Sequence, residues 1–300
     1  MKKVIVTLII GLLAMDLTVV TGRGYVLTAL AARLLGRSEC SLAEVLDEQA
    51  KTVPVPVIAS KLTLERTEAG LDLWNTPQGL IWTVHGTTIL PLLMSEQLLD
   101  IYEPKGHEVR RGDIVLDCGA NIGVFTRKAL SRGAGLVVAI EPAPQTLTAF
   151  RRNFDTEIRN GRVVVYPKGV WDHDGEMELS VNEKNPGGNS LVTPRDASSP
   201  GVRVPLTTID KIVAELKLAR VDFIKMDIEG AEKPALKGAE NTIKRFRPRM
   251  SVSIEHLADD STAIPQLVHS IEPNYSHQGC DCGETRQGIK AMVLAFDPIR

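Results

Sequence analysis

Short apolar runs alternate with helical patterns from residue 113 onward, and this alternation constrains the fold more than any other feature of the sequence. The apolar runs are 114–116, 136–140, 162–166, 221–226 and 250–254. Stretches with helical spacing lie between them, at 124–132, 145–154 and 232–246. A further run at 290–296 is expected to pair antiparallel with residues around 275–278. Strands that alternate with helices predict βαβ units and a mostly parallel α/β sheet.

Acidic residues stand where several of these predicted strands end. They are Asp117, Glu141, Asp227 with Glu229, and Glu255 with His256. For any single one of them, a helix cap or a surface carboxylate is the alternative interpretation. Open α/β sheets bind ligands outside the carboxyl ends of their strands, so four such ends in one domain predict a ligand site.

The turn after the first predicted strand narrows the choice of ligand. It contains Gly119, Ala120, Asn121 and Gly123, and glycines allow a tight turn and close approach of a ligand. The stretch matches neither the dinucleotide G-x-G-x-x-G pattern nor a P-loop. Asp117 at the strand mouth would repel a pyrophosphate but attract the sulfonium and ammonium groups of S-adenosylmethionine.

Two further strand ends suit the nucleoside part of such a ligand. Glu141 can accept hydrogen bonds from both ribose hydroxyls, and it lies one βαβ unit beyond Asp117. Val170 follows the third strand, where an adenine edge would lie, and Asp172 is a candidate partner for the adenine amino group. A simple turn over 172–175 explains Asp172 at least as well.

Several motifs together resemble the FkbM family of S-adenosylmethionine-dependent methyltransferases. They are D-C-G-A-N-I-G at 117–123, E-P at 141–142, G-N-S-L at 188–191, L-T-T-I-D at 206–210, K-M-D-I-E-G-A-E at 225–232 and E-H at 255–256. The resemblance covers about residues 95–260. It implies a class I methyltransferase (Rossmann-like) fold, with a seven-stranded sheet, helices on both faces and a last antiparallel strand. It also implies S-adenosylmethionine as cofactor and O-methylation of a hydroxyl.

Three residues beside the expected methyl-transfer position are candidates for the chemistry. His256 is the expected general base, because an imidazole pKa ordinarily lies near neutral pH. Asp227 and Glu229 are expected to orient the acceptor or share that role. The same three residues also suit a divalent metal, although no fixed ligand spacing supports one and none is expected. His256 as a buried structural histidine is the remaining interpretation.

The expected activity is methylation of a hydroxyl on a sugar, lipid or secondary metabolite. An N-methyltransferase and a non-catalytic nucleoside-binding protein on the same fold are the alternatives. The expected partner is therefore a small-molecule or glycan acceptor. Lys and Arg number 35 against 37 Asp and Glu, and aromatic residues make up 4%, so no nucleic-acid partner is expected.

The N-terminus carries an apolar run, residues 4–20, behind Lys2 and Lys3. The run is shorter than the roughly 20 apolar residues of a spanning helix, and it contains Asp16. A signal peptide, a signal anchor and a hydrophobic helix are the alternatives. Because S-adenosylmethionine is a cytosolic compound, a cytoplasmic location is expected. Residues 4–35 would then form an uncleaved helix lying on the inner face of a membrane.

Three domains are expected: 1–35, an N-terminal extension over 36–110, and a methyltransferase domain over 111–300. The extension is expected to hold a hairpin of 71–74 with 80–84 and a short helix at 95–102. The segment 181–202 is a long polar loop, either functional or a surface hairpin. Cys280 and Cys282 are expected to be reduced thiols in a loop.

Overall fold

The computed structural model describes residues 55–182, 185–192, 201–285 and 288–299. The chain divides into two compact units, and the larger one holds Val53–Gln278 and Leu294–Arg300. The smaller unit includes Gly279–Val293. The site described below lies wholly in the larger unit. Residues 1–54, with the predicted N-terminal helix and the first domain boundary, lie outside the described residues.

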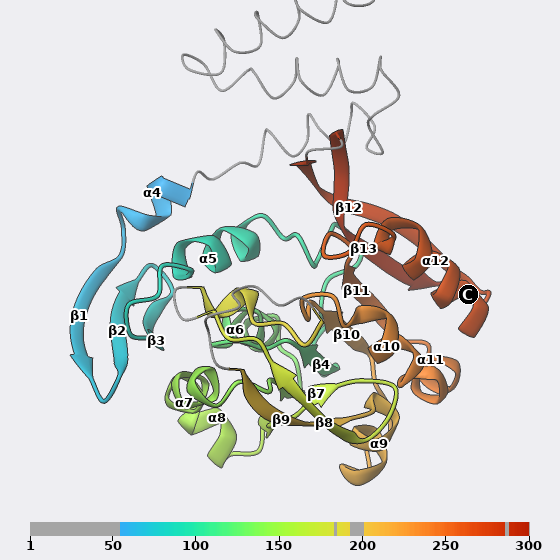
Figure 1. Ribbon diagram of the computed structural model, residues 1–300, viewed down its shortest axis with the longest axis horizontal. Helices are drawn as coiled ribbons and strands as arrows, with labels where there is room; N and C mark the ends of the chain where they lie inside the picture. Colours follow the sequence, from blue (N-terminus) through green and yellow to red (C-terminus); the bar gives the residue numbers. More distant parts are fainter. Residues whose placement is uncertain (1–54, 183–184, 193–200, 286–287, 300) are drawn as a thin grey trace, which may run out of the picture. The chain divides into compact units, whose positions relative to one another are not determined.

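A seven-stranded sheet forms the centre of the fold, in the order β12-β13-β11-β10-β4-β5-β6 (Figure 1). Its strands are β4 (Ile114–Cys118), β5 (Leu136–Ile140), β6 (Val163–Tyr166), β10 (Phe223–Met226), β11 (Arg249–Ser253), β12 (Tyr275–Thr285) and β13 (Gly288–Pro298). β6, β5, β4, β10 and β11 pair in parallel, in that order. Every residue of β10 and β11 is buried, as expected for strands covered on both faces. The structure confirms the predicted mostly parallel sheet.

The last two strands complete this sheet beside β11. β12 and β13 are separated by only two residues, and strands so closely joined pair antiparallel, because a parallel pair needs a long crossover. The order confirms the class I methyltransferase arrangement, in which the last strand lies between its predecessor and the fifth strand. Cys280 and Cys282 lie within β12, so the prediction that they stand in a loop was wrong.

Helices cover both faces of the sheet. They are α4 (Val55–Ala59), α5 (Leu90–Leu98), α6 (Val124–Ser131), α7 (Pro144–Asn153), α8 (Asp155–Arg159), α9 (Ile209–Glu215), α10 (Glu232–Lys237), α11 (Glu240–Phe246) and α12 (Asp260–Ile271). α5 packs on α6, whereas α9, α11, α12 and α10 form a second contiguous group. The single helix predicted over 232–246 is two helices, since α10 ends at Lys237 with Gly238 as its C-cap and α11 begins at Glu240. Gly238 has no room for a side chain, because a Cβ there would lie 2.0 Å from the Trp171 carbonyl oxygen.

A second, three-stranded sheet interrupts the βα alternation, and the sequence patterns did not predict it. It is formed by β7 (Gly169–Val170), β9 (Val202–Thr207) and β8 (Gly175–Leu179), in that order. The described part of the long loop contains a short 3₁₀ turn, Pro186–Gly188, and Ser190 pairs with Ser180 at the end of β8. The loop is therefore anchored on this small sheet at Ser190.

The N-terminal extension packs directly on the helices of the central sheet. Its strands β1 (Thr63–Glu68), β2 (Leu71–Thr76) and β3 (Gly79–Val84) form an antiparallel sheet, which confirms the predicted hairpin. The helix predicted over 95–102 is instead α5, which begins at Leu90, has Pro91 in its first turn and ends at Leu98. A proline suits the first turn of a helix, where its missing N–H is not needed.

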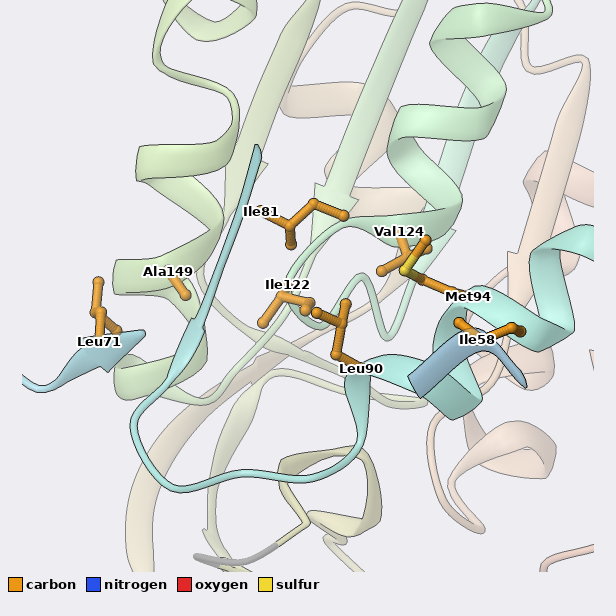
Figure 2. Packing of buried hydrophobic residues seen from close by; sticks show 8 residues of the cluster. All are labelled: Ile58, Leu71, Ile81, Leu90, Met94, Ile122, Val124 and Ala149. Atoms are coloured by element: carbon orange, nitrogen blue, oxygen red, sulfur yellow. The ribbon is translucent and has the colours of Figure 1, made fainter. Parts of the chain in front are cut away.

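One hydrophobic cluster joins the extension to the turn after β4. Figure 2 shows Leu90, Met94 and Ile58 directed at Ile122 and Val124, while Leu71 and Ile81 lie toward α7. Asn153 at the end of α7 adds polar links, because its amide bonds the backbone of Trp82 and the carbonyl of Ile122. The expected boundary near residue 110 stays a prediction, but no separate hydrophobic core surrounds this extension in the described residues.

The helices of the described residues include none with the length and apolar character needed to cross a membrane.

Candidate active site

The turn after β4 needs glycine because other parts of the protein lie against it. Gly119 has φ +79°, and a Cβ there would lie 1.9 Å from the carbonyl oxygen of Asp227. Gly123 has φ +94°, and its Cβ would lie 2.1 Å from the ring of Phe154. Both residues adopt a left-handed conformation that side chains disfavour. The ends of β4 and β10 therefore touch at Gly119.

Glu141, at the end of β5, ties that turn to the next one. One carboxylate oxygen accepts a hydrogen bond from the Asn121 N–H (3.0 Å), and the other accepts one from the Ala143 N–H (2.9 Å). Asn121 takes a left-handed conformation (φ +50°), with its side chain accepting from the Ile122 N–H. Burial raises the pKa of Glu141 to about 7, although both backbone hydrogen bonds act to lower it.

A buried ion pair lies beneath the turn. Asp117 is fully buried and accepts a hydrogen bond from the Thr126 hydroxyl (2.6 Å). The ammonium of Lys225 lies 3.7 Å from Asp117 and 3.8 Å from Asp227, and it donates to the carbonyl of Gly119 (2.9 Å). Burial raises the pKa of Asp117 above its usual range despite the opposing charge of Lys225. Lys225 is the charge that links the ends of β4 and β10.

Asp227 is held by three neighbours at the end of β10. The Tyr102 hydroxyl donates to Oδ2 (2.7 Å), Ser253 adds a side-chain hydrogen bond, and Lys225 supplies a nearby positive charge. Burial acts to raise the pKa of Asp227, but Lys225, then His256 and the hydrogen bonds outweigh it and hold the pKa below its usual range. Asp227 is therefore a carboxylate at neutral pH.

Tyr102 is itself fixed by a buried polar chain. The Ser251 hydroxyl donates to the Tyr102 carbonyl (2.5 Å), and His107 lies 3.1 Å from that hydroxyl through Nε2. The other ring nitrogen of His107 lies 3.0 Å from Asp297 on β13. Because His107 and Ser251 are fully buried, the chain positions Tyr102 and is inaccessible to a substrate.

His256 lies among three carboxylates. Its Nδ1 is 3.0 Å from Glu232, while its Nε2 is 3.5 Å from Asp227 and 3.6 Å from Glu229. The side chain of His256 is only 8% exposed. Burial acts to lower the pKa of His256, but Glu232, Asp227 and Glu229 outweigh it and raise the pKa to about 10. The expectation of a near-neutral pKa therefore does not describe His256 in this cluster.

Glu232 and Glu229 are positioned by the backbone of the turn between β10 and α10. Fully buried Glu232 accepts hydrogen bonds from the N–H groups of Ile228 (2.8 Å) and Gly230 (3.0 Å). Glu229 takes a left-handed conformation, φ +57°. Its carbonyl accepts a hydrogen bond from the Ser190 hydroxyl (2.6 Å). The long loop therefore reaches the strand-end site through Ser190.

These residues form two adjoining halves. The β4–β5 half comprises Asp117, Gly119, Asn121 and Glu141, and the β10–β11 half comprises Asp227, Glu229 and His256. Lys225 and the contact between Gly119 and Asp227 join them.

Comparison with known protein families identifies the family of the chain. The family model of the methyltransferase FkbM domain matches residues 117–283, more than half of the chain. The chain belongs to the FkbM methyltransferase family. The matched region begins at Asp117 and contains both halves of the site.

Curated relatives of this FkbM-family chain agree. It is 27% identical to "Methyltransferase 1" of Beauveria bassiana over 42% of the chain and 58% of that protein. It is 26% identical to the 31-O-demethyl-FK506 methyltransferase FkbM of Streptomyces tacrolimicus, over 56% of the chain and 74% of that protein. It is 28% identical to the 2-O-methyltransferase NoeI of Sinorhizobium fredii, over 45% of the chain and 60% of that protein. The chain thus spans about three fifths of the length of two of these relatives.

Most of the predicted site residues of this FkbM-family chain lie together. Asp117, Gly119, Ala120, Asn121, Gly123 and Glu141 form one continuous turn structure, and Asp227, Glu229 and His256 adjoin it. Val170 is buried in β7, and a Cβ on the preceding Gly169 would lie 4.0 Å from Pro142, beside Glu141. Asp172 instead pairs with the neighbouring His173 at the surface, which fits the simple-turn alternative.

The L-T-T-I-D motif of the family is structural in this chain. The Thr208 side chain accepts from the Lys211 N–H and caps α9. Asp210 accepts hydrogen bonds from the backbone and side chains of Asn241 and Thr242, at the start of α11. The motif fixes two helix starts and makes no contact with the strand-end cluster in the described residues.

Three residues of the site were not predicted from the sequence: Tyr102, Lys225 and Glu232. Lys225 carried a usable signal, because a lysine inside an otherwise apolar strand is rarely buried without a partner. In the sequence, Glu232 is indistinguishable from an ordinary carboxylate in the first turn of a helix, where acidic residues are common. Tyr102 carried no local signal, since its partner Asp227 is 125 residues away in the sequence.

Proposed function

We propose that this chain transfers a methyl group from S-adenosylmethionine to a hydroxyl of a sugar, lipid or secondary metabolite. One observation carries the proposal. The β4–β5 half and the β10–β11 half meet at Gly119 and Lys225, so a donor held by one half lies beside an acceptor held by the other. Family membership supports the same activity.

The β4–β5 half fits the donor chemically. The Oδ1 atom of Asp117 is buried without a hydrogen-bond partner and lies 3.7 Å from the ammonium of Lys225, so Asp117 would act on the positive groups of the donor as a nearby buried charge that it shares with Lys225. Glu141 uses one acceptor position on each oxygen for Asn121 and Ala143, and a carboxylate has about four such positions. Two therefore remain for the ribose hydroxyls. Asp117, the Gly119–Asn121 turn and Glu141 would hold the cofactor, with Val170 beside the adenine and Asp172 as a weaker candidate.

The β10–β11 half supplies the groups for the acceptor. Bound S-adenosylmethionine supplies the methyl group, which leaves sulfur and forms a bond with the acceptor oxygen. Asp227, a carboxylate at neutral pH, accepts the hydroxyl proton, with Glu229 beside it. A weak base suffices, because the oxygen becomes strongly acidic as the methyl group arrives. His256, which carries a proton at neutral pH in this cluster, orients the acceptor instead of removing the proton first.

The names of two relatives support a hydroxyl acceptor. The Streptomyces tacrolimicus protein is named as an enzyme acting on 31-O-demethyl-FK506, and the Sinorhizobium fredii protein as a 2-O-methyltransferase. We extend O-methylation to this chain as part of the proposal. N-methylation and nucleoside binding without turnover are the alternatives.

Two measurements test the proposed function. Isothermal titration of the full chain with S-adenosylmethionine is expected to give one site per chain, and absence of binding would refute the proposal. Transfer of a labelled methyl group into extracted glycans, lipids and small metabolites then identifies the acceptor. Labelled products that release methanol on alkaline hydrolysis would show methyl esters, and products labelled only on nitrogen would favour the N-methyltransferase.

We further propose a cytoplasmic location with the chain attached to the inner face of a membrane through residues 4–35. The proposal rests on the sequence alone, since these residues lie outside the described part of the chain. Cell fractionation followed by a carbonate wash tests it. Release by carbonate supports an interfacial helix, whereas a mature chain starting near residue 32 outside the cytosol would refute it.

A further inference from the structure

We propose that the β10–β11 half is a binding site for a first-row divalent cation such as Mn²⁺, with Asp227, Glu229 and the Nε2 atom of His256 as its protein ligands. The inference deepens the proposed function and rests on it for the cation's role, but not for its binding. It also replaces the expectation that no metal binds here.

The spacing of the three groups is the first argument. Nε2 of His256 stands 3.5 Å from Asp227 Oδ1 and 3.6 Å from Glu229 Oε2, which is longer than a normal hydrogen bond. Two ligand atoms around a cation bonded at about 2.1 Å lie roughly 3.0–3.4 Å apart for octahedral or tetrahedral angles. Small side-chain adjustments would therefore bring Nε2 and each of these two carboxylates to the separation of atoms bound to one cation. Among the described residues, Asp227, His256 and Glu232 offer ligand atoms that all lie within 4.8 Å of one another, and Glu229 adjoins them at Nε2.

The surroundings of His256 are the second, independent argument. The ring is more than nine-tenths buried, and Glu232 lies 3.0 Å from Nδ1, so the other nitrogen is directed at Asp227 and Glu229. A carboxylate behind one ring nitrogen is the usual device that orients a metal-binding histidine. Glu232 is in turn held by two backbone N–H groups, which fixes the direction of the ring.

Asp227 has the same kind of support. Tyr102 and Ser253 hold it by hydrogen bonds, with Tyr102 on Oδ2, and Oδ1 faces His256. Ligating carboxylates are commonly fixed by hydrogen bonds of this kind. Asp227 and His256 are therefore each held in place by neighbouring side chains, as the protein ligands of a cation commonly are.

The donor set indicates the class of cation. Two carboxylates with one imidazole combine the oxygen ligands that suit Mg²⁺ and Mn²⁺ with the nitrogen ligand that suits later first-row metals. Mn²⁺ accepts both. Beside the acceptor position, the cation would bind the acceptor hydroxyl and lower its pKa, and Asp117 and Glu141 would remain free to hold the donor.

Titration of the chelator-treated full chain with Mn²⁺ alone tests the inference. We expect one Mn²⁺ per chain, and at least a tenfold weaker affinity for Asp227→Asn and for His256→Gln. Glu232→Gln should weaken Mn²⁺ binding by about 10- to 100-fold, because it loosens the ring without removing a ligand. Asp259→Asn is the matched control, since this carboxylate is exposed and pairs with Lys233. Circular dichroism establishes that each variant is folded.

The outcomes separate this inference from the proposed function. Absence of Mn²⁺ binding, or binding equally strong in the folded Asp227→Asn and His256→Gln variants, overturns the cation site. Because the cofactor lies in the other half, S-adenosylmethionine binding by the same chelator-treated chain is expected to persist. If Mn²⁺ binding fails and cofactor binding persists, the methyltransferase proposal stands. If cofactor binding fails and Mn²⁺ binding persists, the cation site stands alone.

Discussion

The two halves of the strand-end site are built in different ways. In the β4–β5 half, the carboxylate of Glu141 is occupied by the protein's own backbone, because it accepts hydrogen bonds from the N–H groups of Asn121 and Ala143. In the β10–β11 half, side chains face one another, with His256 between Asp227, Glu229 and Glu232. The first half is a shaped turn, and the second is a cluster of charges.

This difference suggests a division of work. A turn that is defined by backbone conformation suits one invariant molecule, and the proposed donor is the same whichever acceptor is methylated. A cluster of side chains around an open position leaves room for acceptors of different shape. Substitutions in the β4–β5 half should therefore change cofactor binding, substitutions in the β10–β11 half should change turnover, and substitutions where the halves meet should change both and also stability.

The largest effect is expected where the halves touch. Gly119→Ala places a methyl group 1.9 Å from the Asp227 carbonyl oxygen, so β4 and β10 must separate. We expect a loss of more than about 4 kcal/mol in the free energy of unfolding, together with loss of cofactor binding. Chemical denaturation measures the first and titration the second.

Gly106→Ala is the matched control for Gly119→Ala. Gly106 has a similar positive φ of +93°, but no atom lies within 4 Å of the added Cβ. The strain alone should cost about 1–2 kcal/mol, and cofactor binding should be unchanged. Equal losses in the two variants would show that conformation, and not the contact between the halves, explains Gly119.

The next largest effect is expected at the charge that joins the halves. Lys225→Met leaves Asp117 and Asp227 without their common counter-charge in a buried site. Removing one partner of a buried ion pair typically costs about 3–5 kcal/mol. In a double variant that also carries Asp117→Asn, the loss should be smaller than the sum of the two single losses. Lys211→Met, at an exposed pair with Asp174, is the control and should change stability little.

The strand-end residues were predictable from the sequence because each follows an apolar run with a clear period. Asp117, Glu141, Asp227 and His256 all lie at such ends, and parallel strands bring those ends together. The parallel order of the sheet followed from the same alternation. The small sheet β7–β9–β8 was missed, since β8 is mostly exposed and β7 has only two residues, so neither shows a strand pattern.

Contacts across long sequence separations account for the rest. Tyr102 reaches Asp227 through tertiary packing, with its carbonyl bound by Ser251 and its ring against Phe125 of α6, and no local pattern contains that information. The pKa of His256 was misjudged for the same reason, because it is set by three carboxylates that the fold gathers around the ring. The motifs identify which residues matter, but the fold decides their protonation and partners.

A change confined to the β10–β11 half should affect turnover and not cofactor binding. His256→Ala should lower kcat by about 10²-fold, because it removes the charged group that orients the acceptor. The affinity for S-adenosylmethionine should stay within twofold, because the other half is unchanged. Steady-state kinetics and titration measure the two quantities, and wild-type turnover would return His256 to a structural role.

A change confined to the β4–β5 half should instead weaken the binding of S-adenosylmethionine. Glu141→Ala removes the carboxylate proposed for the ribose hydroxyls, and hydrogen bonds to a charged group are worth about 1.5–3 kcal/mol. We expect cofactor binding to weaken by about 10- to 100-fold, with a much smaller change in kcat at saturating cofactor. A large fall in kcat with unchanged affinity would reverse the assignment of the two halves.

The smallest effect is a pH dependence that Glu141 should give to the β4–β5 half. Burial raises the pKa of Glu141 to about 7 from an ordinary value of 4.5, so the folded protein binds a proton more readily than the unfolded chain. Its contribution to stability is therefore complete below pH 4.5 and is lost as the pH rises through 7.

Cofactor affinity should change in the opposite direction over the same range, because the ribose hydroxyls need the ionised carboxylate as acceptor. With a pKa of about 7 and binding only to the ionised form, affinity should increase about tenfold between pH 6 and pH 8. Glu141→Gln should bind more weakly and show neither trend. Because Asp227 stays ionised throughout this range, an equal pH response of cofactor affinity in Glu141→Gln would show that another group, and not Glu141, senses the pH.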